Sequence, residues 1–215
     1  MIKIKNTEFV VFDVETTGLF PLDGDKIIEI AAIKYKDLQP VATFHSLINP
    51  MRNVPASATN VNQISDEMLI DAPTAEEFLP GIIDFIGGGC VVGHNVKFDL
   101  NFLCYELSLF GRRLREETPA LDTLKMAKFL IPYLSNYKLS HIAGALGVTI
   151  GETHRALSDS KLTADVLIKL MEMAQDRNIE DLQEFCRQFS VEKPICKGQC
   201  RRPLGQRDRR IEVIV

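Results

Sequence analysis

An apolar run that ends in two acids stands near the start of the chain. Residues 8–15 read EFVVFDVE, a pattern typical of a buried strand with polar residues at its end. Residues i and i+2 of a strand point to the same face, so Asp13 and Glu15 project together. Two neighbouring carboxylates repel each other unless a cation lies between them. The run therefore predicts either a cation site or, as the alternative, an ordinary strand end with solvated acids.

The rest of the chain predicts one α/β domain. Strand candidates at residues 26–36 and 41–48 follow the first strand after turns, which indicates a meander of three strands. A short strand at 90–92 lies between helical segments, and the second half of the chain is mainly helical. The helices are expected at residues 74–86, beginning with a Thr74–Glu77 capping box, and at 98–110, 124–130, 140–146, 158–174 and 179–189. Strands first and helices later indicate a mixed sheet flanked by helices.

Composition limits the class and the setting of the protein. The chain has 215 residues, 46% hydrophobic and 25% charged, which fits one medium domain with a core and excludes a disordered chain. No stretch long enough to span a membrane is free of charge, and acids follow the N-terminus too closely for a signal peptide. Five cysteines, mostly set among apolar residues, favour a reduced, cytoplasmic setting without disulfides.

Charge divides the chain into two parts. Residues 191–215 carry seven basic and three acidic residues, so they hold +4 of the net −4 and leave −8 on residues 1–190. We therefore expect a compact acidic domain over 1–190 and a basic extension over 191–215. The extension has three open roles: following phosphates, docking on an acidic partner, or keeping the chain in solution. Cys196 and Cys200 within it are either half of a zinc site or, as we favour, two free thiols.

Two further acids and a histidine stand at helix starts. Asp99 follows the short strand and a polar turn, near the start of a helix, where a carboxylate also suits the helix dipole. Asp159 lies in the first turns of an amphipathic helix, and His154 precedes it by five residues. Taken singly, each has an ordinary explanation as a capping acid or a surface histidine. The order of the motifs is what makes them informative.

In sequence order, D-x-E at 13–15, G-H-N-x-x-F-D at 93–99 and H-x-x-x-x-D at 154–159 resemble the three motifs of the DEDDh 3′–5′ exonucleases. This is the DnaQ-like group of the ribonuclease H-like superfamily, and the chain is similar to bacterial DNA polymerase III proofreading exonucleases. The resemblance spans residues 8–170. It implies an α/β fold with a mixed sheet, in which the first three strands are antiparallel and further strands are parallel, flanked by helices.

The same resemblance implies a two-metal site. It assigns Asp13, Glu15, Asp99 and Asp159 as ligands of two divalent ions, Mg²⁺ or Mn²⁺, which prefer oxygen ligands. Asp13, Glu15 and Asp159 would hold the ion that activates water, and Asp13 with Asp99 the second ion. His154 would take the proton of the attacking water, a role suited to an imidazole. The expected product is a nucleoside 5′-monophosphate.

The nucleotide pocket is implied in less detail. Thr16 and Thr17, through their backbone, and Leu19, through its side chain, match the family's contacts to the terminal nucleotide. Asn95 and Phe98 match positions that line the same pocket, with a turn residue and a core residue as the respective alternatives. Many relatives carry His-Gly where this chain has Asn62-Gln63, which argues against a substrate contact from that loop.

The expected partner is nucleic acid with a free 3′ end. We favour single-stranded DNA because the first motif and the region of His154 look closest to the proofreading group. An RNA-trimming exoribonuclease of the same family is the alternative, since spacing does not show contacts to the 2′-hydroxyl. A noncatalytic binding module is a third reading, which the complete set of acids disfavours. A chain of 215 residues leaves no room for a polymerase, so we expect a free-standing nuclease or a DNA polymerase subunit.

Overall fold

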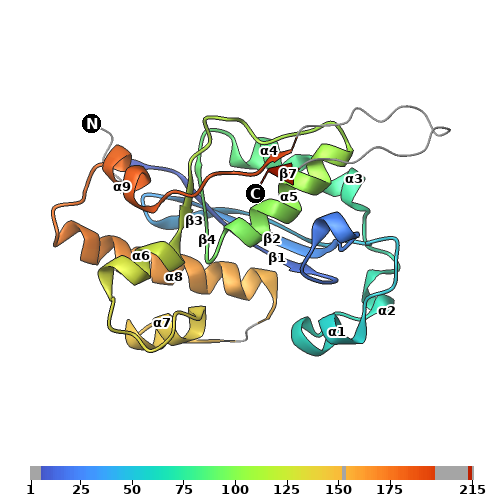
Figure 1. The fold of residues 1–215 in the computed structure, drawn as a ribbon, viewed down its shortest axis with the longest axis horizontal. Coiled ribbons are helices and arrows are strands. Elements are labelled where there is room, and N and C mark those ends of the chain that lie inside the picture. Colours follow the sequence, from blue (N-terminus) through green and yellow to red (C-terminus); the bar gives the residue numbers. More distant parts are fainter. Residues whose placement is uncertain (1–5, 152–153, 197–212, 215) are drawn as a thin grey trace.

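A five-stranded mixed sheet forms the centre of the molecule (Figure 1). The structure is a computed structural model that describes residues 6–151, 154–196 and 213–214. The strands are β1 Phe9–Thr16, β2 Ile27–Lys36, β3 Gln39–Leu47, β4 Cys90–Gly93 and β5 Ala120–Asp122, with a separate pair, β6 Ile195–Cys196 and β7 Val213–Ile214. The helices are η2 Pro21–Asp23, α1 Ala56–Asn62, α2 Asp66–Leu69, α3 Ala75–Phe78, α4 Gly81–Ile86, α5 Lys97–Leu109, α6 Thr123–Leu130, α7 Leu139–Ala145, α8 Ala156–Gln175 and α9 Leu182–Phe189.

The strand order is β3-β2-β1-β4-β5. β1 pairs antiparallel with β2, and β2 pairs antiparallel with β3, as the meander predicted. β1 pairs parallel with β4, and β4 pairs parallel with β5. The predicted mixed sheet is therefore confirmed. β5 was not expected from the sequence, because three residues are too short to show strand alternation.

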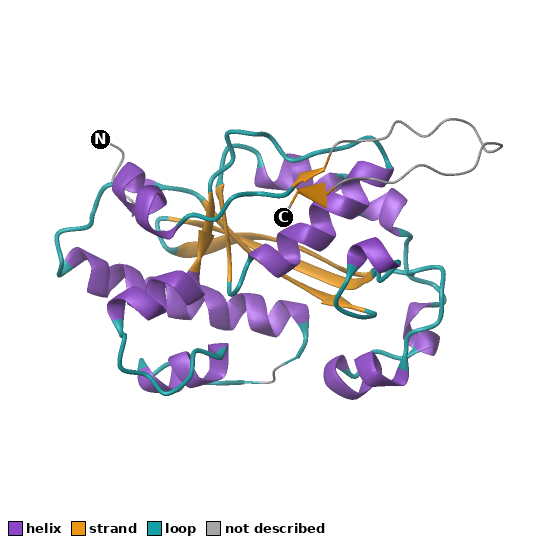
Figure 2. Ribbon diagram, in the orientation of Figure 1, coloured by secondary structure: helices purple, strands orange, loops and turns teal. Residues whose placement is uncertain are grey.

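Helices cover both faces of the sheet (Figure 2). The alternation of side chains along β1 shows how: Phe9 and Val11 pack into a core cluster with residues of α6, α7, α8 and α9. Val10 and Phe12 point the other way, into a cluster with residues of α4 and α5. The odd-numbered series of β1 thus faces α8. Continued toward the end of the strand, that series places Asp13 and Glu15 on the same face.

The helix predicted over residues 74–86 begins where expected but is not continuous. The 74–86 helix is divided into α3 and α4. Thr74 does form the capping box, with its N–H donating to Glu77 Oε2 at 2.8 Å. Pro80 then separates the two helices, because proline has no N–H to donate to the preceding turn and its ring crowds that turn. The other predicted helices agree within a few residues, and α1 and α2 were not expected.

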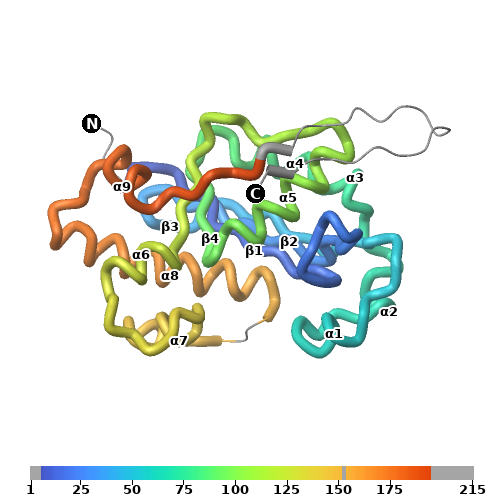
Figure 3. Tube along the Cα trace, viewed as in Figure 1, coloured from blue at the N-terminus to red at the C-terminus, as the bar shows by residue number. Residues whose placement is uncertain are grey.

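The segment after α9 returns across the molecule toward α5 (Figure 3). Val191 N donates to Ala120 O at 2.9 Å, and Lys193 Nζ donates to Glu116 O at 2.9 Å, so the first residues beyond 190 pack on the domain. Residues 197–212 and 215 of the basic extension, which include Lys197, its five arginines and Cys200, lie outside the described residues. The boundary at residue 190 stays a prediction. In the described part of the chain, no helix combines the length and apolar character needed to cross a membrane.

Gly93, where β4 ends, has no room for a side chain. A Cβ there would lie 2.7 Å from Val96 Cγ2 and 3.3 Å from Phe12 O. We expect Gly93→Ala to lower the free energy of unfolding by about 1–3 kcal/mol, since Val96 and β1 must shift. The melting temperature should fall by about 2–10 °C. Gly88→Ala is the matched control, because nothing lies within 4 Å of its Cβ. Equal melting temperatures for the two variants would contradict this steric reading.

Candidate active site

Three carboxylates gather where β1 meets the start of α8. Asp13 and Glu15 come from β1, and Asp159 comes from the first turn of α8. Each offers one oxygen, and these oxygens all lie within 4.8 Å of one another. Strand alternation directs the first two toward α8, and the helix places the third opposite them. The structure thus brings together residues separated by most of the domain.

Asp99 approaches the group from the α5 side. Beyond the end of β4, the Val14 N–H of β1 donates to Asp99 Oδ1 at 3.0 Å. The Asp99 side chain is buried, and its charge acts on that of Asp13. Asp99 therefore stands beside the three-carboxylate group without belonging to it.

The electrostatics of the four acids favour a bound cation. Burial, followed by the charges of Asp99 and Glu15, raises the pKa of Asp13 well above its usual range. Burial, with the charge of Asp159, raises the pKa of Glu15 to about 7. Burial raises the pKa of Asp99 to about 8 although the Val14 N–H stabilises its charge, and burial also raises the pKa of Asp159. Carboxylate oxygens are the ligands that Mg²⁺ and Mn²⁺ prefer, so this donor set fits a divalent-cation site.

His154 is tied to Asp159 through the backbone. Its N–H donates to Asp159 Oδ2 at 2.9 Å, and its φ is 64°, in the left-handed region. A non-glycine residue seldom adopts this conformation, and such residues cluster at functional sites. The imidazole is exposed. The third motif therefore presents an accessible histidine at the same end of α8 as the carboxylate group.

The side chains of the residues expected to contact the terminal nucleotide differ in their exposure and in their hydrogen bonds within the protein. Thr16 Oγ1 donates to Gly18 O at 2.6 Å. Thr17 is buried, accepting from Lys26 N at 3.0 Å and donating to Asp25 Oδ1 at 3.3 Å, so its side chain holds its own loop. Leu19 is 67% exposed. Of these three side chains, only that of Leu19 is largely exposed.

Asn95 and Phe98 have clear structural contacts. Asn95 has a φ of 58°, and its N–H donates to Asp122 Oδ1 at 2.9 Å, so it forms the turn after β4. The Phe98 ring lies 5.1 Å from that of Phe102 and packs against the cluster on the α5 face. The structural alternative for each residue is thus present in the fold.

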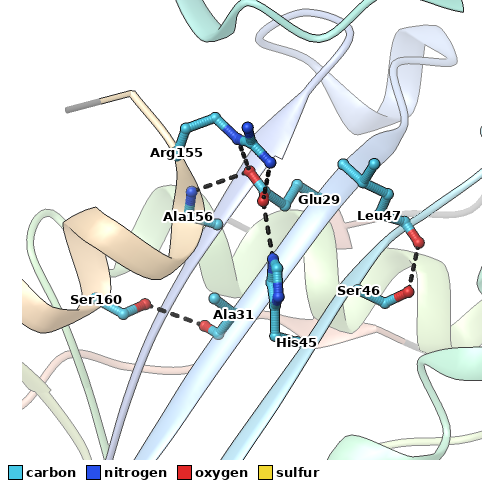
Figure 4. A network of polar contacts seen from close by, with 8 residues as sticks. All are labelled: Glu29, Ala31, His45, Ser46, Leu47, Arg155, Ala156 and Ser160. Atoms are coloured by element: carbon cyan, nitrogen blue, oxygen red, sulfur yellow. Dashed lines mark hydrogen bonds and ion pairs between the residues drawn. The ribbon is translucent and has the colours of Figure 1, made fainter. Parts of the chain in front are cut away.

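Two positioning residues were missed in the sequence. Asn62 is buried, donates to Thr16 O at 3.4 Å and lowers the pKa of Glu15 by a side-chain hydrogen bond. A single asparagine at the end of the short helix α1 gives no signal of this in the sequence. Glu29 is buried on β2 and binds the start of α8 (Figure 4). Its signal was an acid inside the otherwise apolar run IIEIAAI.

Comparison with known proteins identifies exonuclease relatives. A family model described as exonuclease (RNase_T) matches residues 10–167. "DNA polymerase III PolC-type" of Clostridium perfringens is 38% identical over 177 residues, which are 82% of this chain and 12% of that protein. "DNA polymerase III subunit epsilon" of Aquifex aeolicus is 36% identical over 165 residues, which are 76% of this chain and 80% of that protein.

A solved structure shows the same fold. "Exonuclease X in complex with 5′ overhanging duplex DNA" superposes with a TM-score of 0.68 at 24% identity, covering 83% of this chain and 98% of that one. The chain spans about an eighth of the PolC-type relatives that it matches. The family model covers most of the domain described above, including every acid of the site. The chain therefore belongs to the exonuclease family, within the DnaQ-like group of the ribonuclease H-like superfamily.

Proposed function

We propose that this chain is a divalent-metal-dependent 3′–5′ exonuclease that releases nucleoside 5′-monophosphates, with DNA as its substrate. The observation that carries the proposal is the convergence of Asp13, Glu15 and Asp159 within 4.8 Å. Two contacts support it: Asp99 accepts from the Val14 N–H between Asp13 and Glu15, and the His154 N–H donates to Asp159. A noncatalytic binding module would not need a full set of closely placed acids, whose mutual repulsion costs stability.

Two ions would be held by the four acids. Asp13, Glu15 and Asp159 would hold one Mg²⁺ or Mn²⁺, and Asp13 with Asp99 the other. Bound cations would supply neutralisation of the charge on the phosphate and on the attacking and leaving oxygens. The chain's own contribution is to hold four carboxylates in place despite the raised pKa values of all four.

His154 would act as the general base. Its exposed imidazole accepts the proton of the attacking water, whose oxygen bonds to the terminal phosphorus. The bond from phosphorus to the 3′ oxygen of the preceding nucleotide breaks, and that oxygen takes up a proton. The exposed Leu19 would rest against the terminal base.

DNA is the favoured substrate because the relatives are DNA polymerase III proteins and a structural neighbour holds DNA. A single-stranded 3′ end and association with a polymerase belong to the same proposal. RNA trimming is the competing activity. The cytoplasmic setting expected from the cysteines stays a prediction.

Matched DNA and RNA oligonucleotides, one set labelled at the 5′ end and one at the 3′ end, test the polarity and the substrate together. With Mg²⁺ or Mn²⁺, the 5′-labelled DNA should shorten in single-nucleotide steps. The label of the 3′-labelled DNA should appear at once in a nucleoside 5′-monophosphate. Shortening from the 5′ end would refute the proposed polarity, and faster trimming of RNA would refute DNA as the substrate.

His154→Ala should lower kcat by about 10²–10⁴-fold, because proton transfer to a positioned base is lost. Substrate binding, measured by fluorescence anisotropy in Ca²⁺, should change little. His141→Ala is the matched control, since His141 is an exposed histidine on α7 whose ring contacts Ser135 at 3.4 Å. Full activity in His154→Ala would exclude it as the base.

A further inference from the structure

We propose that Glu29 and Arg155 are positioning residues, an ion-paired latch that holds His154 and Asp159 against the strand carrying the other acids. The inference rests on the proposed function, because it concerns the geometry of that same site. Neither residue needs to touch the substrate. The latch acts through the backbone on which His154 and Asp159 stand.

Glu29 lies opposite Glu15 in the register of β1 and β2, on the face toward α8. Both of its carboxylate oxygens are occupied (Figure 4). Oε2 accepts from Arg155 Nε at 3.1 Å and from the Ala156 N–H at 3.1 Å. Oε1 accepts from Arg155 Nη2 at 2.9 Å and contacts His45 Nε2 at 2.9 Å. The guanidinium is thus held by two parallel hydrogen bonds, the strongest and most directional form of this ion pair.

The start of α8 depends on this contact. Arg155 occupies the N-cap position in an extended conformation, and its side chain makes no cap hydrogen bond. The first N–H groups of a helix have no partner within the helix. Glu29 supplies one from a different strand by accepting the Ala156 N–H. One turn later, Ser160 Oγ donates to Ala31 O of the same strand at 3.2 Å.

These contacts hold three consecutive residues, 154–156, at the start of α8. The His154 N–H is bound by Asp159, while the next residue and the one after it are bound by Glu29. The His154 backbone, in its left-handed conformation, is therefore fixed relative to β2, and through the β1–β2 pairing relative to Asp13 and Glu15. Displacements of about 1 Å at such a site cost about 10²-fold in rate.

The charge of Glu29 argues for positioning over simple packing. A carboxylate at this place faces Glu15 across the strand pair, and like charges there are unfavourable. Its two oxygens nonetheless accept hydrogen bonds from Arg155 and Ala156 and contact His45, and these contacts offset the repulsion. An apolar side chain would pack here without any repulsion, so the ion pair points to orientation of the start of α8.

Three variants test the latch. Glu29→Gln keeps the shape of the side chain and removes the ion pair, and Arg155→Lys keeps the charge and removes the paired hydrogen bonds. Each should lower kcat by about 10–100-fold while KM stays within about 3-fold, because only the placement of the base and ligand changes. Glu29→Gln combined with Arg155→Lys should lose no more than the larger of the two single losses, since the two residues act as a unit.

A second readout needs neither metal nor substrate. In the metal-free protein, the Ala156 amide should exchange with solvent at least about 10-fold faster in Glu29→Gln than in the wild type. The Leu167 amide, in the middle of α8, should keep its rate. Arg155 is 36% exposed on its side chain, so Arg155→Lys keeps the test open should the buried variant fail to fold.

Glu106→Gln is the matched control. Glu106 is another buried carboxylate that accepts a backbone N–H, from Ile27 at 3.0 Å, and pairs with a cation, Lys26, at 3.8 Å. This variant should lower the melting temperature yet keep kcat within about 3-fold.

Unchanged Ala156 exchange, additive losses, or an equal kcat loss in Glu106→Gln would overturn the latch. Absence of trimming by the wild type would refute the proposed function instead, and the exchange data would still report on the contact.

Discussion

Asp13→Asn is expected to abolish 3′ trimming and to make the metal-free protein more stable. Asp13 is central to the carboxylate group and would contact both cations, so its loss should lower kcat/KM by at least about 10³-fold. Asparagine has the same shape and no charge, which removes the repulsion from Asp99 and Glu15. The stability gain should be about 1–3 kcal/mol at pH 8.

Thermal unfolding in a chelator measures the second half of this prediction. The melting temperature of Asp13→Asn should exceed that of the wild type by about 2–10 °C. Asp165→Asn serves as control, because this carboxylate is exposed on α8 and lies outside the acidic group. A destabilised Asp13→Asn would show that Asp13 is not repelled by the neighbouring acids. Trimming within about tenfold of the wild-type rate would show that Asp13 is not a metal ligand.

Cation affinity is expected to rise steeply with pH. The pKa of Glu15 is about 7 and that of Asp99 about 8 in the metal-free protein, so both carboxyls hold protons at pH 6 and lose them above pH 8. A cation binds the deprotonated forms and releases those protons. Mn²⁺ affinity should therefore increase by about 10–100-fold from pH 6 to pH 8. Calorimetric titration in two buffers of different ionisation enthalpy measures the released protons, and a flat affinity without proton release would refute the shared site.

The stability of the metal-free protein should fall as pH rises, whereas its cation affinity increases. The raised pKa values mean that the folded state binds more protons than the unfolded state between about pH 4 and pH 8. The free energy of unfolding of the metal-free protein should thus fall as pH rises through this window. Added Mg²⁺ should raise the melting temperature more at pH 8 than at pH 6.

Local periodicity made the central part of the site predictable. The alternation in β1 was enough to pair Asp13 with Glu15, and the amphipathic pattern of α8 was enough to place Asp159 near the start of a helix. Which elements meet was inferred only from the resemblance to exonucleases, since residue spacing does not encode contacts between distant segments. The structure brings those elements together as the resemblance implied.

The contacts that support the site were not predictable for the same reason. Glu29 binds residues 126 and 127 positions away, and nothing in the local pattern indicates the partner. Asn62 supports Glu15 from the last residue of α1, a short helix that the sequence did not predict. β5 was missed because it is short, and the division between α3 and α4 because apolar residues at helical spacing continue past Pro80. Hydrogen bonds between segments that are distant in the sequence can be identified only once the fold is known.

The parts of the site arrive in a fixed order during synthesis. β1 emerges first, α5 next and α8 last, so a growing chain that ends before α8 lacks Asp159, His154 and the partners of Glu29. In such a chain Glu29 keeps its contact to His45 but lacks the Arg155 guanidinium and the Ala156 N–H. Any unfinished or prematurely terminated product is therefore expected to be inactive and poorly folded, so nuclease activity should arise only after α8 has been synthesised.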